Sequence, residues 1–356
     1  MLELKQQKKL KLSKYPYTYV RTAVMKSLLF GKDDYHKMLK MGFSEIAKFL
    51  QDSSYRKEIN ALANEYSGAD LLELALNRNL AESFKKLVRI SPYELALLIK
   101  EYTKRKDIDD IKTILRGKFT NANEKLIENS ITGAGTLSFD FLVSLIKKES
   151  IEDVLRNNRL VEFSLLEDGL NDLKEKKNLV SIENALDKYY FSHIIQFSKI
   201  LPREGELFRN FLLEEVEISN ILTLLRLKKA RIGKSVAKNF IILSGNRLKD
   251  SKIIRLAGLD DLEELSNALG NTEYRNAVAK GFEEFKKNNS LITLETELYK
   301  YLLKQSALFM HQHPLSVDVI LGYMFAKEIE VRNLKIIVKG RQLGLSEKFI
   351  ENQLVL

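Results

Sequence analysis

The chain has 356 residues, of which 45% are hydrophobic and 30% charged, which is typical of a globular protein and not of a disordered one. It contains no cysteine, which excludes disulfides and thiolate sites, and no apolar run of about 18 residues that could span a membrane. Glycine and proline are scarce, with 16 and 4 residues, and this favours helices.

The chain starts with a lysine-rich segment. MLELKQQKKLKLSK holds five lysines and one glutamate, so it carries a surplus of four of the ten positive charges. It lacks the long apolar core of a signal peptide. Two interpretations stay open, a solvated N-terminus or a loose attraction to anionic lipid or RNA.

Three of the four prolines are evenly spaced along the chain. Pro92, Pro202 and Pro314 are 110 and 112 residues apart, and a long helical pattern follows each one. Proline is favoured in the first turn of a helix, because its missing N–H would have no partner there anyway. Each proline therefore predicts the start of a helix, and the helix after Pro314 is expected to run to about Lys339.

The three long helical patterns repeat one another. Residues 107–118 share six of twelve identities with residues 217–228, and Glu217 and Asn220 match Glu330 and Asn333 in the third copy. IENALDKYY from Ile182 resembles LETELYKYL from Leu294 at a similar offset. A period of about 110 residues is far longer than that of common solenoids, so each unit is large enough for several helices and its own core.

The repeat predicts an all-α fold of three similar helical domains in a pseudo-threefold arrangement with a central cavity at the axis. The expected domains are residues 1–108, 109–218 and 219–356. The first copy lacks the leading helix and the last has one to spare, so the C-terminal helix is expected to close the circle. GLSEKFIENQL predicts a short final helix, with Ser346 as its N-cap.

The polar residues at matching positions of the long helices are the candidate functional residues. They are either interdomain packing residues or contacts that line the central hollow. These residues are Asp107, Asp110, Glu217, Asn220, Glu330 and Asn333.

No motif for catalysis, cofactor binding or metal binding is found. RIGKS, from Arg231, lacks the glycine that a phosphate-binding loop needs five positions before its Gly–Lys pair, where this chain has Lys228. His311 and His313 diverge on a helix, and His36 and His193 have no partner in the sequence for acid–base chemistry. Basic and acidic residues alternate along most helices, whereas a nucleic-acid footprint concentrates positive charge on one face.

The chain resembles the C subunit of archaeal-type (A/V-type) rotary ATPases, equivalent to the d subunit of eukaryotic vacuolar ATPases. PLSVDVILGYMFAKEIEVRNLKIIVKGRQLGLSEKFIENQLV is similar to the closing stretch of that family, and YTYVRTAVMKSLLFGKDDYHKML to its opening. The resemblance covers essentially the whole chain except the lysine-rich start.

This resemblance implies a funnel-shaped, non-catalytic subunit of an A/V-type ATP synthase or ATPase, without cofactors, on the cytoplasmic face of the cell membrane. One copy would act as a socket between the central stalk, with its D-type and F-type subunits, and the proteolipid rotor ring that moves protons or other ions. The ring has many identical subunits, whereas the socket is one chain with a rough threefold repeat. Because their repeats cannot match one to one, a polar docking face is expected. Two other classes remain open, a basic helical scaffold or nucleic-acid-binding protein, and an enzyme with an unrecognised site.

Overall fold

A computed structural model describes residue 12, residues 14–312 and residues 315–356. Helices joined by short turns make up this described part, which contains no strand, so the predicted all-α class is confirmed. Pro314 and His313 lie outside the described residues, as does most of the lysine-rich start.

One order of helices recurs along the chain. A long helix is followed by four shorter helices and then by a second long helix. The first complete copy consists of α7 (Tyr93–Phe119), α8 (Glu124–Ser130), α9 (Phe139–Ile146), α10 (Ile151–Asn157), α11 (Glu167–Lys176) and α12 (Val180–Ile200). The second consists of α13 (Glu206–Lys229), α14 (Lys234–Ala237), α15 (Asp250–Ala257), α16 (Leu262–Leu269), α17 (Arg275–Asn288) and α18 (Ile292–Gln312).

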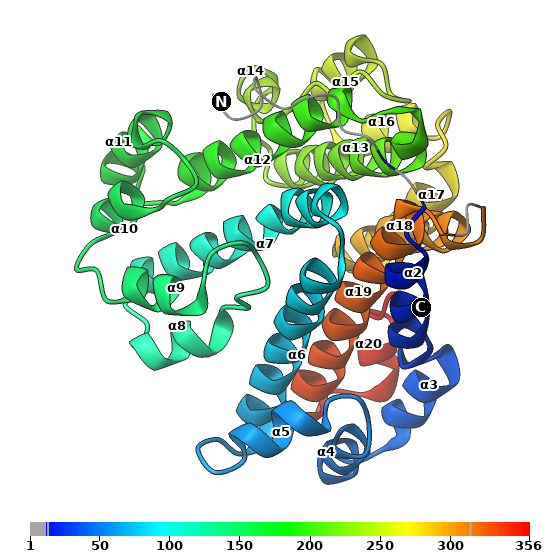
Figure 1. The fold of residues 1–356 in the computed structure, drawn as a ribbon. Coiled ribbons are helices and arrows are strands. Elements are labelled where there is room, and N and C mark those ends of the chain that lie inside the picture. Colours follow the sequence, from blue (N-terminus) through cyan, green and yellow to red (C-terminus); the bar gives the residue numbers. More distant parts are fainter. Residues whose placement is uncertain (1–11, 13, 313–314) are drawn as a thin grey trace. The chain divides into compact units, whose positions relative to one another are not determined.

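The third copy is divided between the two ends of the chain. Its first two helices are C-terminal, α19 (Val317–Gln342) and α20 (Glu347–Glu351). The helices that would continue it are N-terminal, α3 (Lys32–Lys40), α4 (Phe43–Gln51), α5 (Arg56–Leu62) and α6 (Gly68–Ile90). Single turns of 3-10 helix lie at Phe163–Leu165, Arg203–Gly205 and Lys238–Phe240, and α2 (Pro16–Ser27) precedes α3 (Figure 1).

Two of the three evenly spaced prolines, Pro92 and Pro202, lie just before the helices whose start they predict. Pro92 is the N-cap of α7, and Pro202 is the N-cap of the 3-10 turn that leads into α13. The last long helix begins at Val317, with the Ser316 side chain as its cap, and ends at Gln342, three residues later than expected at each end. The Ser346 hydroxyl accepts a hydrogen bond from the Phe349 N–H, which confirms the predicted cap of the final helix.

The chain forms two compact units. One comprises Met1–Lys40 with Ile195–Leu356, as far as these residues are described, and the other comprises Met41–Ile194. Residues 108 and 218, where the sequence repeat suggests domain boundaries, lie inside α7 and α13. The division into three domains about a central cavity therefore stays a prediction.

Close contact between neighbouring helices recurs inside the units. In one unit a methyl group added at Gly169 on α11 would lie 3.0 Å from the Ile182 Cα of α12. In the other, a methyl group at Gly281 on α17 would lie 2.5 Å from the Leu294 Cα of α18. Ile182 and Leu294 are the first residues of the two matched segments found in the sequence. The repeated glycine thus lets two backbones approach closely in both copies.

Candidate functional site: buried anchors of the long helices

All six candidate residues are buried. Their exposed fractions are between 0% and 2%, and each lies in the middle of α7, α13 or α19. Polar side chains at such positions are stable only when their hydrogen-bonding groups are satisfied. The partners that satisfy them define what these residues do.

The first anchor position holds a loop 22 residues further along the chain. Asn220 Oδ1 accepts a hydrogen bond from the Ile242 N–H at 2.9 Å, and Asn220 Nδ2 donates to the Ile242 carbonyl at 2.7 Å. Asn333 makes the same pair of bonds with Val355, at 2.9 and 2.8 Å. Each side-chain amide therefore satisfies both the N–H and the carbonyl group of one loop residue.

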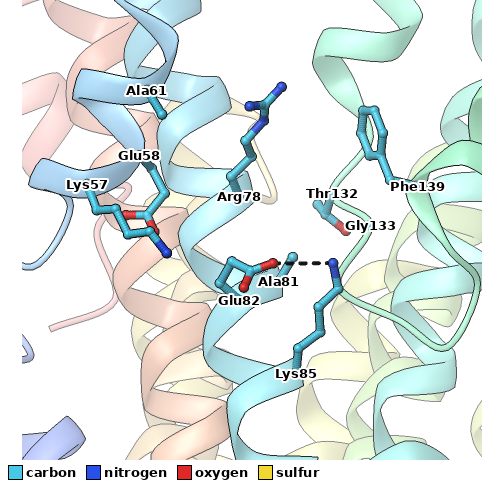
Figure 2. A pocket seen from close by; sticks show the side chains of 10 residues that line it. All are labelled: Lys57, Glu58, Ala61, Arg78, Ala81, Glu82, Lys85, Thr132, Gly133 and Phe139. Carbon is cyan, nitrogen blue, oxygen red and sulfur yellow. Dashed lines mark hydrogen bonds and ion pairs between the residues drawn. The ribbon is translucent and has the colours of Figure 1, made fainter.

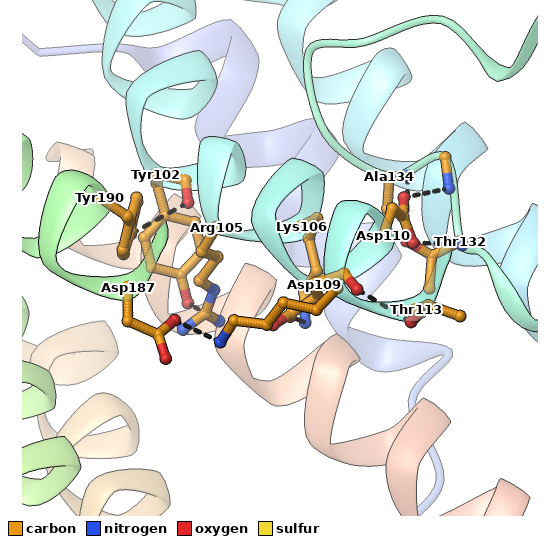
Figure 3. Close-up of polar contacts among 12 residues, drawn as sticks. Tyr102, Arg105, Lys106, Asp109, Asp110, Thr113, Thr132, Ala134, Asp187 and Tyr190 are labelled. Carbon is orange, nitrogen blue, oxygen red and sulfur yellow. Dashed lines mark hydrogen bonds and ion pairs between the residues drawn. The ribbon is translucent and has the colours of Figure 1, made fainter. Parts of the chain in front are cut away.

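Asp110 occupies this position in α7. Its carboxylate accepts hydrogen bonds from the N–H groups of Thr132, again 22 residues away, at 2.7 Å and of Gly133 at 2.9 Å. Figure 3 shows Asp110 facing the loop that carries Thr132 and Ala134. Burial raises the pKa of Asp110 to about 6, and the hydrogen bonds from the loop only partly oppose this rise.

The second anchor position holds the residue that leads into the next helix. Asp107 accepts a hydrogen bond from the Leu137 N–H at 2.9 Å, two residues before α9 begins. Glu217 accepts one from the Leu248 N–H at 2.7 Å, two residues before α15, and another from the Tyr274 hydroxyl at 2.7 Å. Burial raises the pKa of both carboxylates.

In the third copy the partner comes from the other end of the chain. Glu330 Oε2 accepts a hydrogen bond from the Phe30 N–H at 2.6 Å, and Phe30 lies two residues before α3. Glu330 Oε1 accepts a second bond from Lys327 Nζ at 2.8 Å, and both side chains are buried. The loop that the second anchor of α19 binds therefore comes from the N-terminal segment.

The anchors do not converge on a shared reaction centre. Each of the six residues binds a loop of its own copy, so two local roles are each repeated in three copies. These contacts hold a loop against a long helix within one unit. Packing between domains and direct contact with a stalk or ring both stay predictions.

The three long helices that carry the anchors, α7, α13 and α19, end in the same turn. Asn121, Arg231 and Gly344 all adopt positive φ, at 53°, 56° and 67°. In each case the residue that follows donates its N–H to the carbonyl of the fifth residue before it, for example Ala122 to Gly117 at 2.9 Å. This arrangement closes the C-terminus of the helix and turns the chain into the next short helix.

The short helices after these turns expose an apolar side chain at matching positions. Leu126 on α8 is 60% exposed, Val236 on α14 46%, and Phe349 on α20 50%. The spacings of 110 and 113 residues are those of the sequence repeat. An exposed lysine accompanies each one, Lys125, Lys234 and Lys348. We call these three apolar residues the apolar tips.

Ion pairs also follow the repeat. Arg116 on α7 binds Glu183 on α12 through two nitrogens, at 2.6 and 2.9 Å. Arg226 on α13 binds Glu295 on α18 in the same way, at 3.0 and 2.7 Å. These arginines are half-exposed yet paired, so much of the basic character of the long helices is neutralised locally.

Sequence reasoning missed two buried polar clusters. The Glu101 carboxylate lies 2.8 Å from Lys104 Nζ and 2.5 Å from His193 Nε2. The buried Glu214 carboxylate lies 2.6 Å from the Arg247 guanidinium, and burial nevertheless raises its pKa to about 7. Lys104, Glu214 and Lys327 share one repeat position, three residues before the second anchor, and that spacing was the signal available in the sequence.

A cavity of about 320 Å³ lies between α5, α6 and the start of α9 (Figure 2). Lys57, Arg78 and Lys85 line it together with Glu58 and Glu82. Lys85 pairs with Glu82 at 3.4 Å, and the Glu58 carboxylate accepts a hydrogen bond from a neighbouring asparagine at 2.9 Å. Thr132 also lines the cavity, and its hydroxyl donates to the buried Asp110 carboxylate at 3.1 Å, so this polar group too is engaged within the protein.

The RIGKS segment has no phosphate-loop geometry. Lys228 is buried, and its ammonium group donates hydrogen bonds to the carbonyls of Ala257 and Leu259 at 3.1 and 2.5 Å. Lys234 pairs with Asp260 at 2.7 Å. Both lysines are therefore engaged by the protein itself.

The described residues also bear on metal binding and membrane spanning. In the part of the chain that the structure describes, no three histidine, aspartate or glutamate side chains come together in a way that could hold a metal ion. Among the same residues, no helix combines the length and the apolar character that a membrane crossing requires.

Comparison with known proteins gives a consistent result over nearly the whole chain. The family model described as ATP synthase (C/AC39) subunit matches residues 19–353. The C subunit of the A-type ATP synthase of Methanococcoides burtonii is 38% identical over 347 residues, which cover 97% of this chain and 95% of that protein. Its namesake in Methanosarcina barkeri is 37% identical, covering 96% and 93%, and that of Haloferax volcanii 31% identical, covering 96% and 97%.

Proposed function

Because the chain belongs to the ATP synthase (C/AC39) subunit family, we propose that it is the socket that couples the central stalk of an A/V-type rotary ATPase to its membrane rotor ring. Membership of this family makes it a subunit of such a complex, and a structural subunit, not the catalytic one. The proposed partners are the D-type and F-type stalk subunits and the proteolipid ring. The proposed place is the cytoplasmic face of the cell membrane, held peripherally with one copy per complex.

The threefold repetition of the buried anchors carries this proposal. A torque coupler needs three stiff walls of equal construction more than it needs a reactive group. The hydrogen bonds of Asn220 and Asn333 fix a loop against a long helix in the same way, and Asp110 does so with a carboxylate. Such satisfied buried polar contacts resist deformation, because any shift would leave polar groups unpaired.

The junction of Phe30 with Glu330 supports a closed arrangement of the three copies. It gives α19 the same anchored loop that α7 and α13 have, although its partner is 300 residues away in the sequence. A funnel with a central cavity is the arrangement that we propose for the three copies. It would receive the stalk at the cavity and would contact the ring elsewhere.

The apolar tips support repeated contact with one partner. Leu126, Val236 and Phe349 are exposed at the same position of each copy, where burial in the monomer cannot explain an apolar side chain. Each is accompanied by an exposed lysine, of which Lys234 is paired with Asp260, so the proposed contact combines a small apolar centre with a rim whose charge comes mainly from Lys125 and Lys348. That combination suits a ring whose repeating units outnumber the three copies.

The test is co-purification of the full-length chain with the membrane complex. A tagged chain is expressed in cells that make the complex, membranes are solubilised in mild nonionic detergent, and the bound polypeptides are identified by mass. Stalk and proteolipid subunits are expected in constant ratio to the chain. Recovery of the chain alone, or together with RNA that is lost steeply as salt rises, would contradict the proposal and favour a nucleic-acid-binding protein.

Variants of the apolar tips sharpen this experiment. Changing Leu126, Val236 and Phe349 to Gln should keep the chain folded, because these side chains are exposed, and should reduce recovery of the proteolipid severalfold. Leu165→Gln is the matched control, since Leu165 is 56% exposed but lies in a 3-10 turn outside the repeat position. Equal loss in the control would show that any exposed apolar residue has the same effect.

A further inference from the structure

Helix α2 stands outside the repeat. In the two complete copies, the chain between the short helix and the following helix contains no helix of the length of α2. In the third copy this place is occupied by α2, which comprises Pro16–Ser27 and packs along α19 (Figure 1). Since α7 and α13 are anchored without such a helix, the fold of a copy does not depend on it.

Helix α2 does not turn its most apolar face toward the protein, as an amphipathic surface helix usually does. The side against the protein buries Thr18, Thr22 and Met25, and the Thr22 hydroxyl donates a hydrogen bond to the Thr18 carbonyl at 2.7 Å. The outer side exposes four larger apolar side chains, with exposed fractions of 64% for one and 57% for the other three. These residues are Tyr17, Val20, Val24 and Leu28, and we call them the α2 stripe.

The spacing of the α2 stripe is that of a helix–helix seam. Its members are three, four and four residues apart, so they lie along one line of the helix surface. Apolar residues three or four positions apart share one helix face, and such a face can dock into an apolar groove or against a second helix. Valine, which occupies two of the four positions, gives little of the bulky apolar area by which helices enter a lipid surface.

The charge of α2 indicates which charge a helix that packs on it should carry. The helix contains no acidic residue, and Arg21 is exposed beside Val20 and Val24. Lys14 is exposed just before the helix begins, and Lys26 lies in its last turn. A partner that carries carboxylates beside its apolar residues would complement this surface, whereas a basic partner would be repelled.

We propose that the α2 stripe is the docking site for an amphipathic helix of another subunit, with an apolar seam flanked by Asp or Glu. This rests on the proposed function, since it requires a protein complex around the chain. The contact is separate from the apolar tips, because α2 has no counterpart in the other copies. It therefore gives the chain one contact that the other two copies do not offer.

Photo-crosslinking in the assembled complex tests the proposal. A benzophenone amino acid is placed at Val20 or Val24 of the full-length chain, with Leu165 as an exposed control position. After irradiation of the detergent-solubilised complex, mass spectrometry maps the adducts. The expected adduct joins either α2 position to a helical segment of another polypeptide that carries carboxylates beside its apolar face, at several times the control yield.

A charge variant provides the second measurement. Arg21→Glu should lower the crosslinking yield from Val24 severalfold, whereas Arg21→Lys should keep most of it. An adduct to lipid, to the chain's own first residues, or at the control yield would overturn the proposal. If the chain co-purifies with the complex but gives no α2 adduct, this inference fails alone, whereas a chain that does not co-purify removes both it and the proposed function.

Discussion

At the scale of single residues, the first anchor position holds an amide side chain in two copies and a carboxylate in the third. All three side chains are buried in the same kind of contact with a loop. Asn220 and Asn333 both accept from and donate to the same loop residue. Asp110 can only accept while it is ionised, and burial of its charge raises its pKa from 3.8 to about 6. At the first anchor position, the α7 copy therefore carries an ionisation cost that the amides of the other two copies do not have.

Replacing Asp110 by Asn should remove a pH dependence of stability. Folding raises the pKa, so the cost of ionising Asp110 is absent at low pH and is complete above a pH of about 6. This rise from 3.8 to about 6 corresponds to roughly 3 kcal/mol at neutral pH. We therefore compare the free energy of unfolding of Asp110→Asn with that of the parent chain. This difference is expected to be about 2 kcal/mol more in favour of the variant at pH 8 than at about pH 4.5.

Urea unfolding of both proteins at the two pH values measures this difference. The variant loses an acceptor for the Gly133 N–H, but that loss is independent of pH and cancels in the comparison. Asn220→Asp is the reciprocal control and should introduce the opposite dependence. A difference between Asp110→Asn and the parent that stays constant with pH would contradict the assignment.

The sequence located these residues but not what they bind. Repetition alone marked Asp110, Asn220 and Asn333 as equivalent. Their partners are backbone groups 22 residues away, and backbone groups leave no trace in the identity of a side chain. The contact of Glu330 with Phe30 was equally hidden, because the two residues lie at opposite ends of the chain.

At the scale of helices, the contact between each anchor-bearing long helix and the short helix after it always pairs a small residue with a large one. Which of the two helices carries the large residue differs between the copies. A methyl group at Gly117 would lie 2.4 Å from the Ile127 side chain, and one at Gly340 would lie 2.6 Å from Ile350. Both pairs are ten residues apart. The same positions of the middle copy hold Leu227 and the fully buried Ala237, so the large residue has moved to the other helix.

This exchange predicts compensation between two variants. Gly340→Leu alone should destabilise the chain by about 2 kcal/mol or more, since the added side chain would collide with Ile350. Ile350→Ala alone should cost about 2–5 kcal/mol through the cavity that it leaves. The double variant copies the middle repeat and should recover at least half of the summed loss.

Thermal unfolding of the parent, both single variants and the double variant gives the coupling directly. Losses that simply add would show that the two residues do not share one space. The pairing could not be read from the sequence, because a glycine aligned with a leucine looks like an ordinary mismatch until the opposite residue is known.

At the scale of the whole molecule, the sequence predicted correctly that the chain is helical and that a short helix capped by Ser346 follows the last long one. The structure adds that the N-terminal segment supplies the missing loop at Phe30. Helix α2 was not anticipated as a separate feature, because only exposure reveals that its apolar side faces away from the protein. At this scale, the apolar tips and the lysines beside them lead to a prediction of how salt affects attachment to the ring.

Attachment to the ring should weaken as salt rises. The chain carries a net charge of +10, and exposed lysines accompany all three apolar tips. Charges are screened over roughly 10 Å at 0.1 M salt and over about 3 Å at 1 M, so a charged rim loses most of its attraction in that range. Washing membranes that bear the complex with increasing salt should release the chain with the stalk, while the ring stays in the membrane.

Charge reversal beside the apolar tips should shift this release. Lys125→Glu combined with Lys348→Glu is expected to lower the salt concentration needed for half release severalfold, because the rim would then be attracted less strongly at every concentration. Lys57→Glu is the control, since it changes an exposed lysine of α5, which is not one of the three short helices that carry the tips. The amount of chain left on the membranes is quantified after each wash. If the chain stays bound through 1 M salt and leaves only with mild detergent, then the apolar tips hold it without help from the lysines, and the charged rim has no part in docking.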